Sequence, residues 1–258
     1  MRAATILAVA LVLILAIGLL MPAVLKVREA ANRINCENNL RLVALAIQNY
    51  HGTDGQFPPA AWPNARLPPE RRLSWLVCLG PYYEATDLYV RLDNNKGWDE
   101  EENRYLALKP LRFLQCPSYP DQLPDSTFAP THYVGVSGLG QEAATLPAED
   151  PRAGFFGFDR RLPRADVAAQ SSRLLIALET SRASGSWTAA GRSTVRGLDE
   201  EGPWLGASAP FGGNHPGGAN ALFADGSVRF IRESVDAQVL RAIATVQGSK
   251  GAEVVGDE

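Results

Sequence analysis

An uninterrupted apolar segment opens the chain. Residues 3–25 carry no charged side chain, and Thr5 is the only one of them with a hydroxyl group. At about 1.5 Å per helical residue, such a segment reaches about 34 Å, enough to cross a hydrocarbon layer of about 30 Å. Backbone amides have no other partner in lipid, so the pattern predicts a transmembrane helix. A cleaved secretory signal is the alternative, but its apolar region is usually only about 7–15 residues long and follows a more basic start.

The helical pattern continues beyond the apolar segment. No glycine or proline occurs between Lys26 and Tyr50, and apolar residues recur there at helical spacing. We predict one helix of roughly 45–50 residues, with its first half in lipid and its second half packed on a globular body. Pro22 is a candidate kink, and Pro58 with Pro59 ends the helix. The apolar set at this spacing comprises Val27, Ala31, Ile34, Leu42 and Leu45, with Leu40, Val43 and Ile47 beside it.

Short segments separated by turns make up the rest of the chain. Residues 73–83 are apolar and favour a short helix, and residues 98–107 form an acidic pattern typical of a surface helix. Two apolar runs, at 133–136 and 174–178, predict strands. Ser234 is expected to cap a terminal helix.

The clearest supersecondary signal is a hairpin near the C-terminus. Residues 221–224 and 227–231 flank Asp225 and Gly226, and Asp-Gly can supply the positive φ angles of a tight turn between strands. Together these elements predict an α+β fold in which a long N-terminal helix packs on an antiparallel sheet. We divide the chain into a transmembrane anchor (1–25), a globular domain that includes the second half of the helix (26–247), and a flexible tail (248–258).

The charge of the chain limits the classes of molecule that it is expected to bind. The chain has a formal net charge of −3, and no cluster of basic residues follows one face or one segment of it. Binding to nucleic acid is therefore not expected. The expected partner is membrane lipid, through residues 3–25.

Three stretches carry a resemblance to a known family. The first is PAVLKVREAANRINCENNLRLVALAIQNYHGTDGQFPPA at 22–60; the second runs from SWLVCLGPYY to LQCPS at 74–118; the third is NHPGGANALFADGSVRFI. In the third, His215 precedes Asp225 and Gly226 by nine intervening residues, an H-X9-DG signature. Together they resemble bacterial proteins with a prepilin-type N-terminus and a DUF1559 domain.

The resemblance implies a fold similar to type IV pilins and to the pseudopilins of type II secretion. It implies a structural or interaction protein in the inner (cytoplasmic) membrane, single-pass, with an extracytoplasmic domain. Other pilin-like subunits or the secretion machinery are then the expected partners, and no catalysis and no cofactor are expected. Thr5 stands where the family usually has glutamate, and no basic leader precedes it, so filament assembly and N-terminal processing depart from the family pattern.

The chain has three cysteines, an odd number for an exported domain. Cys36 lies on the predicted helix and Cys116 begins a Cys-Pro-Ser turn, both within family-like segments, whereas Cys78 lies in an apolar run. We predict a Cys36–Cys116 disulfide. Three reduced, buried thiols are the alternative.

The histidines are widely spaced and show no metal-binding pattern. No H-x-x-H or Cys-x-x-Cys motif is present, so we predict no metal site and a structural role for His215, Asp225 and Gly226, with His215 holding its loop against the Asp225-Gly226 turn. A zinc site of His132, His215 and Asp225, serving an envelope-tethered hydrolase, is one alternative. A carbohydrate-binding module that uses Trp187 and Trp204 near the glycine-rich loop is another.

Overall fold

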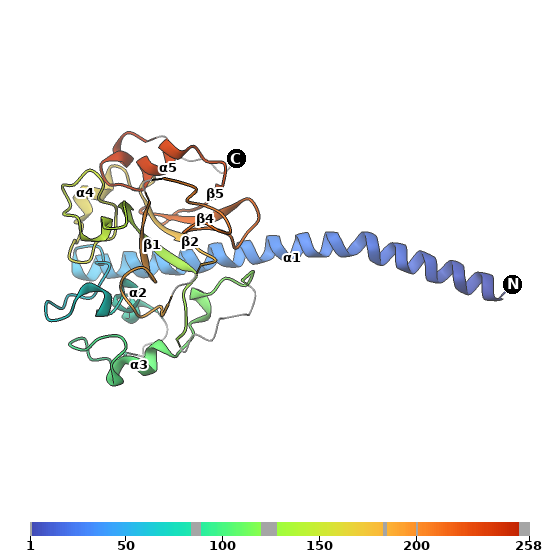
Figure 1. Cartoon of the computed structure of the whole chain (residues 1–258), viewed down its shortest axis with the longest axis horizontal. Coiled ribbons are helices and arrows are strands. Elements are labelled where there is room, and N and C mark those ends of the chain that lie inside the picture. The colour runs from blue at the N-terminus through green and yellow to red at the C-terminus, as the bar shows by residue number, and fades with distance from the viewer. Residues whose placement is uncertain (1, 84–88, 120–127, 183–184, 200, 253–258) are drawn as a thin grey trace.

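The longest element of the protein is α1 (Arg2–Asp54), a continuous helix of 53 residues. We describe a computed structural model that covers residues 2–83, 89–119, 128–182, 185–199 and 201–252. The first half of α1 projects away from the globular body and bends gently, and the helix contains Pro22 (Figure 1). Its most apolar stretch is unburied and is long enough to cross a membrane. The predicted long apolar N-terminal helix is therefore confirmed.

A five-stranded sheet forms the centre of the globular body, with the strand order β3-β1-β2-β4-β5. Strands β1 and β2, β2 and β4, and β4 and β5 pair antiparallel. The edge strand β3 pairs parallel with β1, so the predicted α+β class is confirmed but the sheet is mixed. The strands are β1 (Tyr133–Leu139), β2 (Leu175–Glu179), β3 (Val195–Leu198), β4 (Gly218–Phe223) and β5 (Val228–Arg232).

Short helices surround the sheet. The region predicted as one short helix forms α2 (Trp75–Cys78) followed by a 3-10 turn, Gly80–Tyr82, and the acidic helix is α3 (Glu101–Ala107). The remaining α-helices in the described residues are α4 (Arg164–Ala168) and α5 (Ala237–Ile243), and further 3-10 turns are Pro69–Arg71, Arg112–Leu114, Ala143–Thr145 and Gly248–Lys250.

The C-terminal elements differ in two details from the prediction. The carboxylate of Asp236 accepts hydrogen bonds from the backbone N–H groups of Gln238 (2.7 Å) and Val239 (3.3 Å), so Asp236 and not Ser234 caps α5. Gly248–Lys250, assigned to the flexible tail, forms a 3-10 turn. The tail residues 253–258 lie outside the described residues.

The second half of α1 packs on the body as predicted, but through the residues that we placed beside the main apolar set. The side chains of Cys36, Leu40 and Val43 are fully buried, and Ile47 is almost so. At about 100° per residue these positions lie on the opposite side of the helix from Val27, Ile34 and Leu45 of the main predicted set. Members of that predicted set remain exposed: Val27 (69%), Ile34 (56%), Leu42 (51%) and Leu45 (59%).

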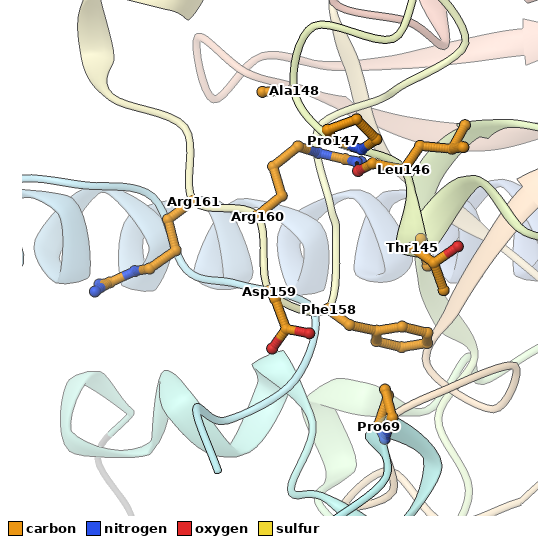
Figure 2. Close-up of a pocket in the computed structure, with 10 residues that line it drawn as sticks. Pro69, Thr145, Leu146, Pro147, Ala148, Phe158, Asp159, Arg160 and Arg161 are labelled. Atoms are coloured by element: carbon orange, nitrogen blue, oxygen red, sulfur yellow. Dashed lines mark hydrogen bonds between the residues drawn. The ribbon is translucent and has the colours of Figure 1, made fainter. Parts of the chain in front are cut away.

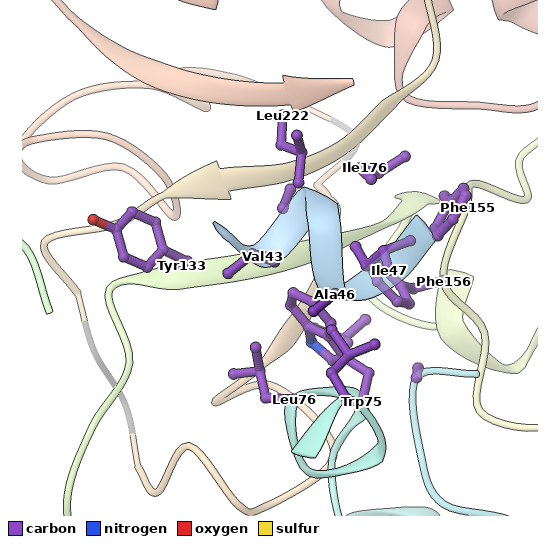
Figure 3. Close-up of a cluster of buried hydrophobic side chains, with 14 of the residues drawn as sticks. Val43, Ala46, Ile47, Trp75, Leu76, Tyr133, Phe155, Phe156, Ile176 and Leu222 are labelled. Carbon is purple, nitrogen blue, oxygen red and sulfur yellow. The ribbon is translucent and has the colours of Figure 1, made fainter. Parts of the chain in front are cut away.

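The buried face of α1 lies between the sheet and α2. Val43, Ala46 and Ile47 point into one hydrophobic cluster (Figure 3). Each large aliphatic side chain buried in this way contributes about 1.5–3 kcal/mol to folding. The cluster thereby fixes the helix to the body. Its other members drawn in Figure 3 include Tyr133, Ile176 and Leu222 from the strands, and Trp75 and Leu76 from α2.

A second cluster buries the other face of the sheet. Leu240 and Ile243 of α5 pack there with strand residues that alternate with those facing α1. All six residues of β4 are buried, as expected for a strand covered on both sides. The body therefore has three layers, and the strand residues of this cluster include Val134, Val136, Leu175, Leu178 and Phe223.

The predicted hairpin is present, with a longer turn than expected. Strands β4 and β5 pair up to Leu222 and Val228. The N–H of Gly226 donates to the carbonyl of Phe223 (2.9 Å), and among the described residues only glycines have positive φ. Gly226, at φ +87°, therefore closes a three-residue loop, and Asp225 does not take the left-handed conformation that a two-residue Asp-Gly turn requires.

Candidate functional site

His215 lies in the loop before β4, where it contacts the long helix. Its Nδ1 is 2.5 Å from Oε1 of Glu29, which lies on α1 just past the apolar segment. The second carboxylate oxygen of Glu29 accepts a hydrogen bond from Ser118 Oγ (2.7 Å). The side chain of His215 is buried. Glu29, which it contacts, lies 186 positions earlier in the chain.

The Asp-Gly half of the H-X9-DG signature lies at the opposite end of β4. The amide of Gln48 donates to the carbonyl of Ala224 (3.2 Å), and the nearest side-chain atom to a Cβ on Gly226 is that of Ala44. Glu29 and Gln48 are about 28 Å apart along a helix at about 1.5 Å per residue. The two halves therefore contact α1 at separate points.

This separation corrects three expectations. His215 does not hold its loop against the Asp225-Gly226 turn, because β4 lies between them. Asp225 cannot join His132 and His215 in the zinc site considered above, and the hydrolase that would use His215 with Asp225 loses its shared site. The carboxylate of Asp225 instead accepts hydrogen bonds from the N–H (2.9 Å) and hydroxyl (2.7 Å) of Ser227, which is turn chemistry.

The structure brings the predicted cysteine pair to His215. The sulfur atoms of Cys36 and Cys116 lie 2.9 Å apart as free thiols, and Cys116 Sγ is 3.6 Å from His215 Nε2. All three side chains are buried. They come from α1, from the loop after the 3-10 turn Arg112–Leu114, and from the loop before β4. We call Cys36, Cys116 and His215 the helix clasp, because they join α1 to two loops of the body.

A buried carboxylate stands beside the helix clasp. Glu179, at the end of β2, is fully buried, and its Oε1 is 3.5 Å from His215 Nε2. Asn220 of β4 orients it by donating from its backbone N–H (2.6 Å) and its side-chain amide (3.0 Å). Sequence reasoning missed both Glu29 and Glu179. For Glu179 the available signal was its position directly after the apolar run 174–178, whereas Glu29 lies four residues past the apolar segment, among charged residues.

Charge is distributed unequally between the two thiols. The hydrogen bond with Cys36 is the largest cause that lowers the pKa of Cys116, to about 6, whereas the same bond and burial raise the pKa of Cys36. Burial opposes the protonation of His215, but its contacts with Cys116, Glu179 and Glu29 outweigh burial and raise its pKa to about 10. The site therefore favours a Cys116 thiolate beside a His215 imidazolium.

His132 supports the clasp without belonging to it. Its Nδ1 accepts a hydrogen bond from the backbone N–H of Cys116 (2.8 Å), and its ring packs on Tyr119. Burial lowers the pKa of His132 to about 4, so the imidazole is neutral and can accept at this atom. His132 thus positions the loop that carries Cys116.

The other residues singled out in the sequence lie elsewhere. Cys78 is buried in α2. Trp187 and Trp204 are also buried, and their indole N–H groups donate to the carbonyls of Lys109 (2.9 Å) and Asp199 (2.8 Å). The two indoles therefore do not form the exposed platform that stacking on a sugar requires.

Comparison with known proteins agrees with the resemblance seen in the sequence. A family model described as "Protein of unknown function (DUF1559)" matches residues 26–168 and 141–238. The chain belongs to the DUF1559 family. No curated protein matches the chain, and no solved structure matches it. All residues of the helix clasp, together with Glu29 and Glu179, fall within the DUF1559 match, and the apolar segment precedes it.

Two cavities of the DUF1559 domain differ in the residues that line them. One of about 340 Å³ is lined by Arg160, Arg161 and Asp159 (Figure 2). Arg160 donates to backbone carbonyls including those of Ser137, Gly154 and Phe156, while Arg161 pairs with Asp54 and Asp159 with Arg72. The charged groups that line this cavity are therefore already paired within the fold. A cavity of about 330 Å³ lies beside the clasp, lined by Cys116, Asn35, Asn39, Arg112, Gln115, Pro117 and Tyr119.

Proposed function

We propose that this DUF1559 protein is a pilin-like structural subunit of the bacterial cell envelope that associates with further copies through α1. The observation that carries the proposal is the exposed apolar face on the second half of the helix. Val27, Ile34, Leu42 and Leu45, which we call the exposed α1 stripe, are each more than half exposed.

The geometry of the stripe suits helix association. At about 100° per residue, Val27, Ile34 and Leu45 lie within about 20° of one another around the helix axis, and Leu42 lies about 60–80° from them. The stripe is diametrically opposite the buried face, so one side of α1 packs on its own body while the other faces outward. It also continues the apolar surface of residues 3–25. Contiguous exposed apolar surfaces of this kind mark interaction sites.

The proposed location is the inner membrane, with one span and the DUF1559 domain outside the cytoplasm. The single N-terminal apolar helix supports a single-pass anchor. The resemblance to prepilin-type proteins and the adjacent Cys36–Cys116 pair, suited to an oxidising compartment, support the extracytoplasmic domain. We propose a structural role and not a catalytic one.

Association can be tested with two differently tagged full-length copies expressed in one bacterial membrane. Copies of the natural sequence are expected to co-purify after mild detergent extraction. The double substitution Ile34→Glu and Leu45→Glu is expected to lower the co-purified fraction about tenfold or more, because it places charges in an apolar contact. Val90→Glu is the matched control, since Val90 is an exposed apolar residue (81%) outside α1.

The result decides between an assembling subunit and a solitary anchored domain. Co-purification that the stripe substitutions reduce and Val90→Glu leaves unchanged supports the proposal. Natural copies that fail to co-purify, or that co-purify equally with both variants, contradict it. The melting temperature of each variant is measured alongside, because an unfolded stripe variant would lose association for another reason.

A further inference from the structure

The helix clasp has the composition of a metal site that the sequence pattern did not reveal. Cys36 Sγ, Cys116 Sγ and one ring nitrogen of His215 all lie within 4.8 Å of one another. Their positions in the chain are far apart, so they form no short sequence motif. In the described residues this is the only group of three histidine, cysteine or acidic side chains gathered in this way.

The donor set selects the kind of cation. Two sulfur atoms and one imidazole nitrogen form a soft to borderline set, which suits Zn²⁺ and does not suit Mg²⁺ or Ca²⁺. Oxygen ligands would be expected for those harder cations.

Neighbouring carboxylates prepare His215 for this role. Glu29 is hydrogen-bonded to Nδ1, an arrangement that fixes the ring and directs Nε2 toward the cysteines. Carboxylate–histidine pairs of this kind commonly orient the imidazole in zinc sites. Glu179 is the nearest further ligand, with Oε1 3.5 Å from Nε2 and its orientation held by Asn220.

The position of the cluster gives a cation access from solvent and would let the bound ion link α1 to the body. The cavity of about 330 Å³ that Cys116 lines lies on one side of the cluster. A cation held here would join α1 to the Cys116 and His215 loops, at the end of the body nearest the apolar segment. Hydrogen bonds and packing now make that connection.

We propose that the helix clasp, with both cysteines reduced, binds one Zn²⁺ through the Cys36 and Cys116 sulfurs and His215 Nε2. The bound ion fastens the membrane-spanning helix to the DUF1559 domain. Oxidation of the metal-free dithiol to a disulfide, with two electrons and two protons passing to an oxidant such as a protein disulfide, leaves no thiolate to hold the ion. Zinc binding and the disulfide therefore exclude each other, and each links α1 to the body at the helix clasp.

The test uses the full chain in detergent, reduced, freed of metal with a chelator and then loaded with Zn²⁺ or Co²⁺. After desalting, elemental analysis is expected to find about one Zn²⁺ per chain. The Co²⁺ form is expected to show thiolate-to-metal charge-transfer absorption. Zinc is also expected to raise the melting temperature of the reduced protein, and addition of chelator to reverse the rise.

Matched variants locate the site. Cys36→Ser and Cys116→Ser are expected to lose the ion, and His215→Ala to lose it or bind it much more weakly. Glu29→Gln is expected to weaken binding by about 10–100-fold, the usual effect of removing such an outer partner. Cys78→Ala and His51→Ala serve as controls and are expected to retain one ion, since neither residue belongs to the clasp.

Two results would overturn the proposal. One is a reduced natural protein that keeps no Zn²⁺ after desalting, or whose Co²⁺ form lacks the thiolate absorption; this outcome needs no variant and holds even if a variant misfolds. The other is an ion retained equally by Cys36→Ser and by the natural sequence, which would place it elsewhere.

Discussion

Single residues on α1 contact loops that are distant in the chain. Cys36 and Cys116 are separated by 80 positions, yet their sulfurs lie 2.9 Å apart. We predict that they form a disulfide in protein isolated without reductant. In the chain-entropy treatment, closing a loop of about 80 residues stabilises the fold by roughly 4–4.5 kcal/mol, less any strain.

Thiol labelling checks this prediction. Protein denatured without reductant is expected to be labelled only at Cys78, and the variant Cys78→Ala is expected to show no labelling. Labelling of all three cysteines would contradict the disulfide and leave the dithiol as the isolated form. In native protein, burial raises the pKa of Cys78, so this thiol is expected to react only after unfolding.

Gly226 is the residue in the H-X9-DG signature whose role is most directly conformational. Its φ of +87° is disfavoured for residues with a Cβ, so Gly226→Val is expected to lower the free energy of unfolding by about 1–2 kcal/mol. Gly226→Asn is expected to cost less, because asparagine enters this region more readily. Chemical denaturation measures both.

Gly251→Val provides the control for the hairpin glycine. Gly251 has a φ of −107°, and no atom lies within 4 Å of the position that a Cβ would take, so its change is expected to stay within about 0.5 kcal/mol. Equal losses of unfolding free energy at both positions would show that the left-handed conformation of Gly226 is not the cause of the destabilisation.

Within α1, Leu40 and Leu42 lie on different faces of the helix and differ in burial. Leu40 is fully buried in the main cluster, whereas Leu42 is 51% exposed. Leu40→Ala is expected to lower the free energy of unfolding by about 2–5 kcal/mol, through lost burial and the cavity left behind. Leu42→Ala is expected to change it by no more than about 0.5 kcal/mol.

This pair tests which face of the helix holds the body. Thermal or denaturant unfolding of the two variants under the same conditions gives the comparison directly. A larger loss for Leu42→Ala would indicate that the exposed α1 stripe packs on the body and would contradict the structure. The same Leu42→Ala variant is expected to weaken copy association, since Leu42 belongs to the exposed α1 stripe.

For the whole molecule, the apolar segment and the folded body are separable. Both hydrophobic clusters are built from residues beyond position 35, and none of their members lies in the projecting half of α1. A chain of residues 27–258 is therefore expected to fold without detergent and to melt cooperatively. Recovery only in detergent, or a melt without a cooperative transition, would contradict this division.

The amino-acid sequence by itself determined the elements whose signal is local. An uncharged run of residues 3–25 can satisfy its backbone in lipid only as a helix, and the absence of glycine and proline carries that helix to Tyr50. Short apolar runs likewise located β1 and β2, and the Asp-Gly turn located the β4–β5 hairpin. These predictions depend on neighbours within a few positions, which the sequence displays.

Only the tertiary structure decided which parts of those elements meet. Both sides of α1 carry apolar residues at helical spacing, so periodicity could not show that Leu40 faces inward and Leu42 outward. The cysteines could be paired from the resemblance, but His215, Glu29 and Glu179 could not be added to them, because contacts across 36 to 186 positions leave no local pattern. His215 precedes β4 and Asp225 follows it, so the two residues lie at opposite ends of this strand. Because β4 packs against α1, His215 contacts the helix at the clasp and the Asp225-Gly226 turn contacts it at the other end.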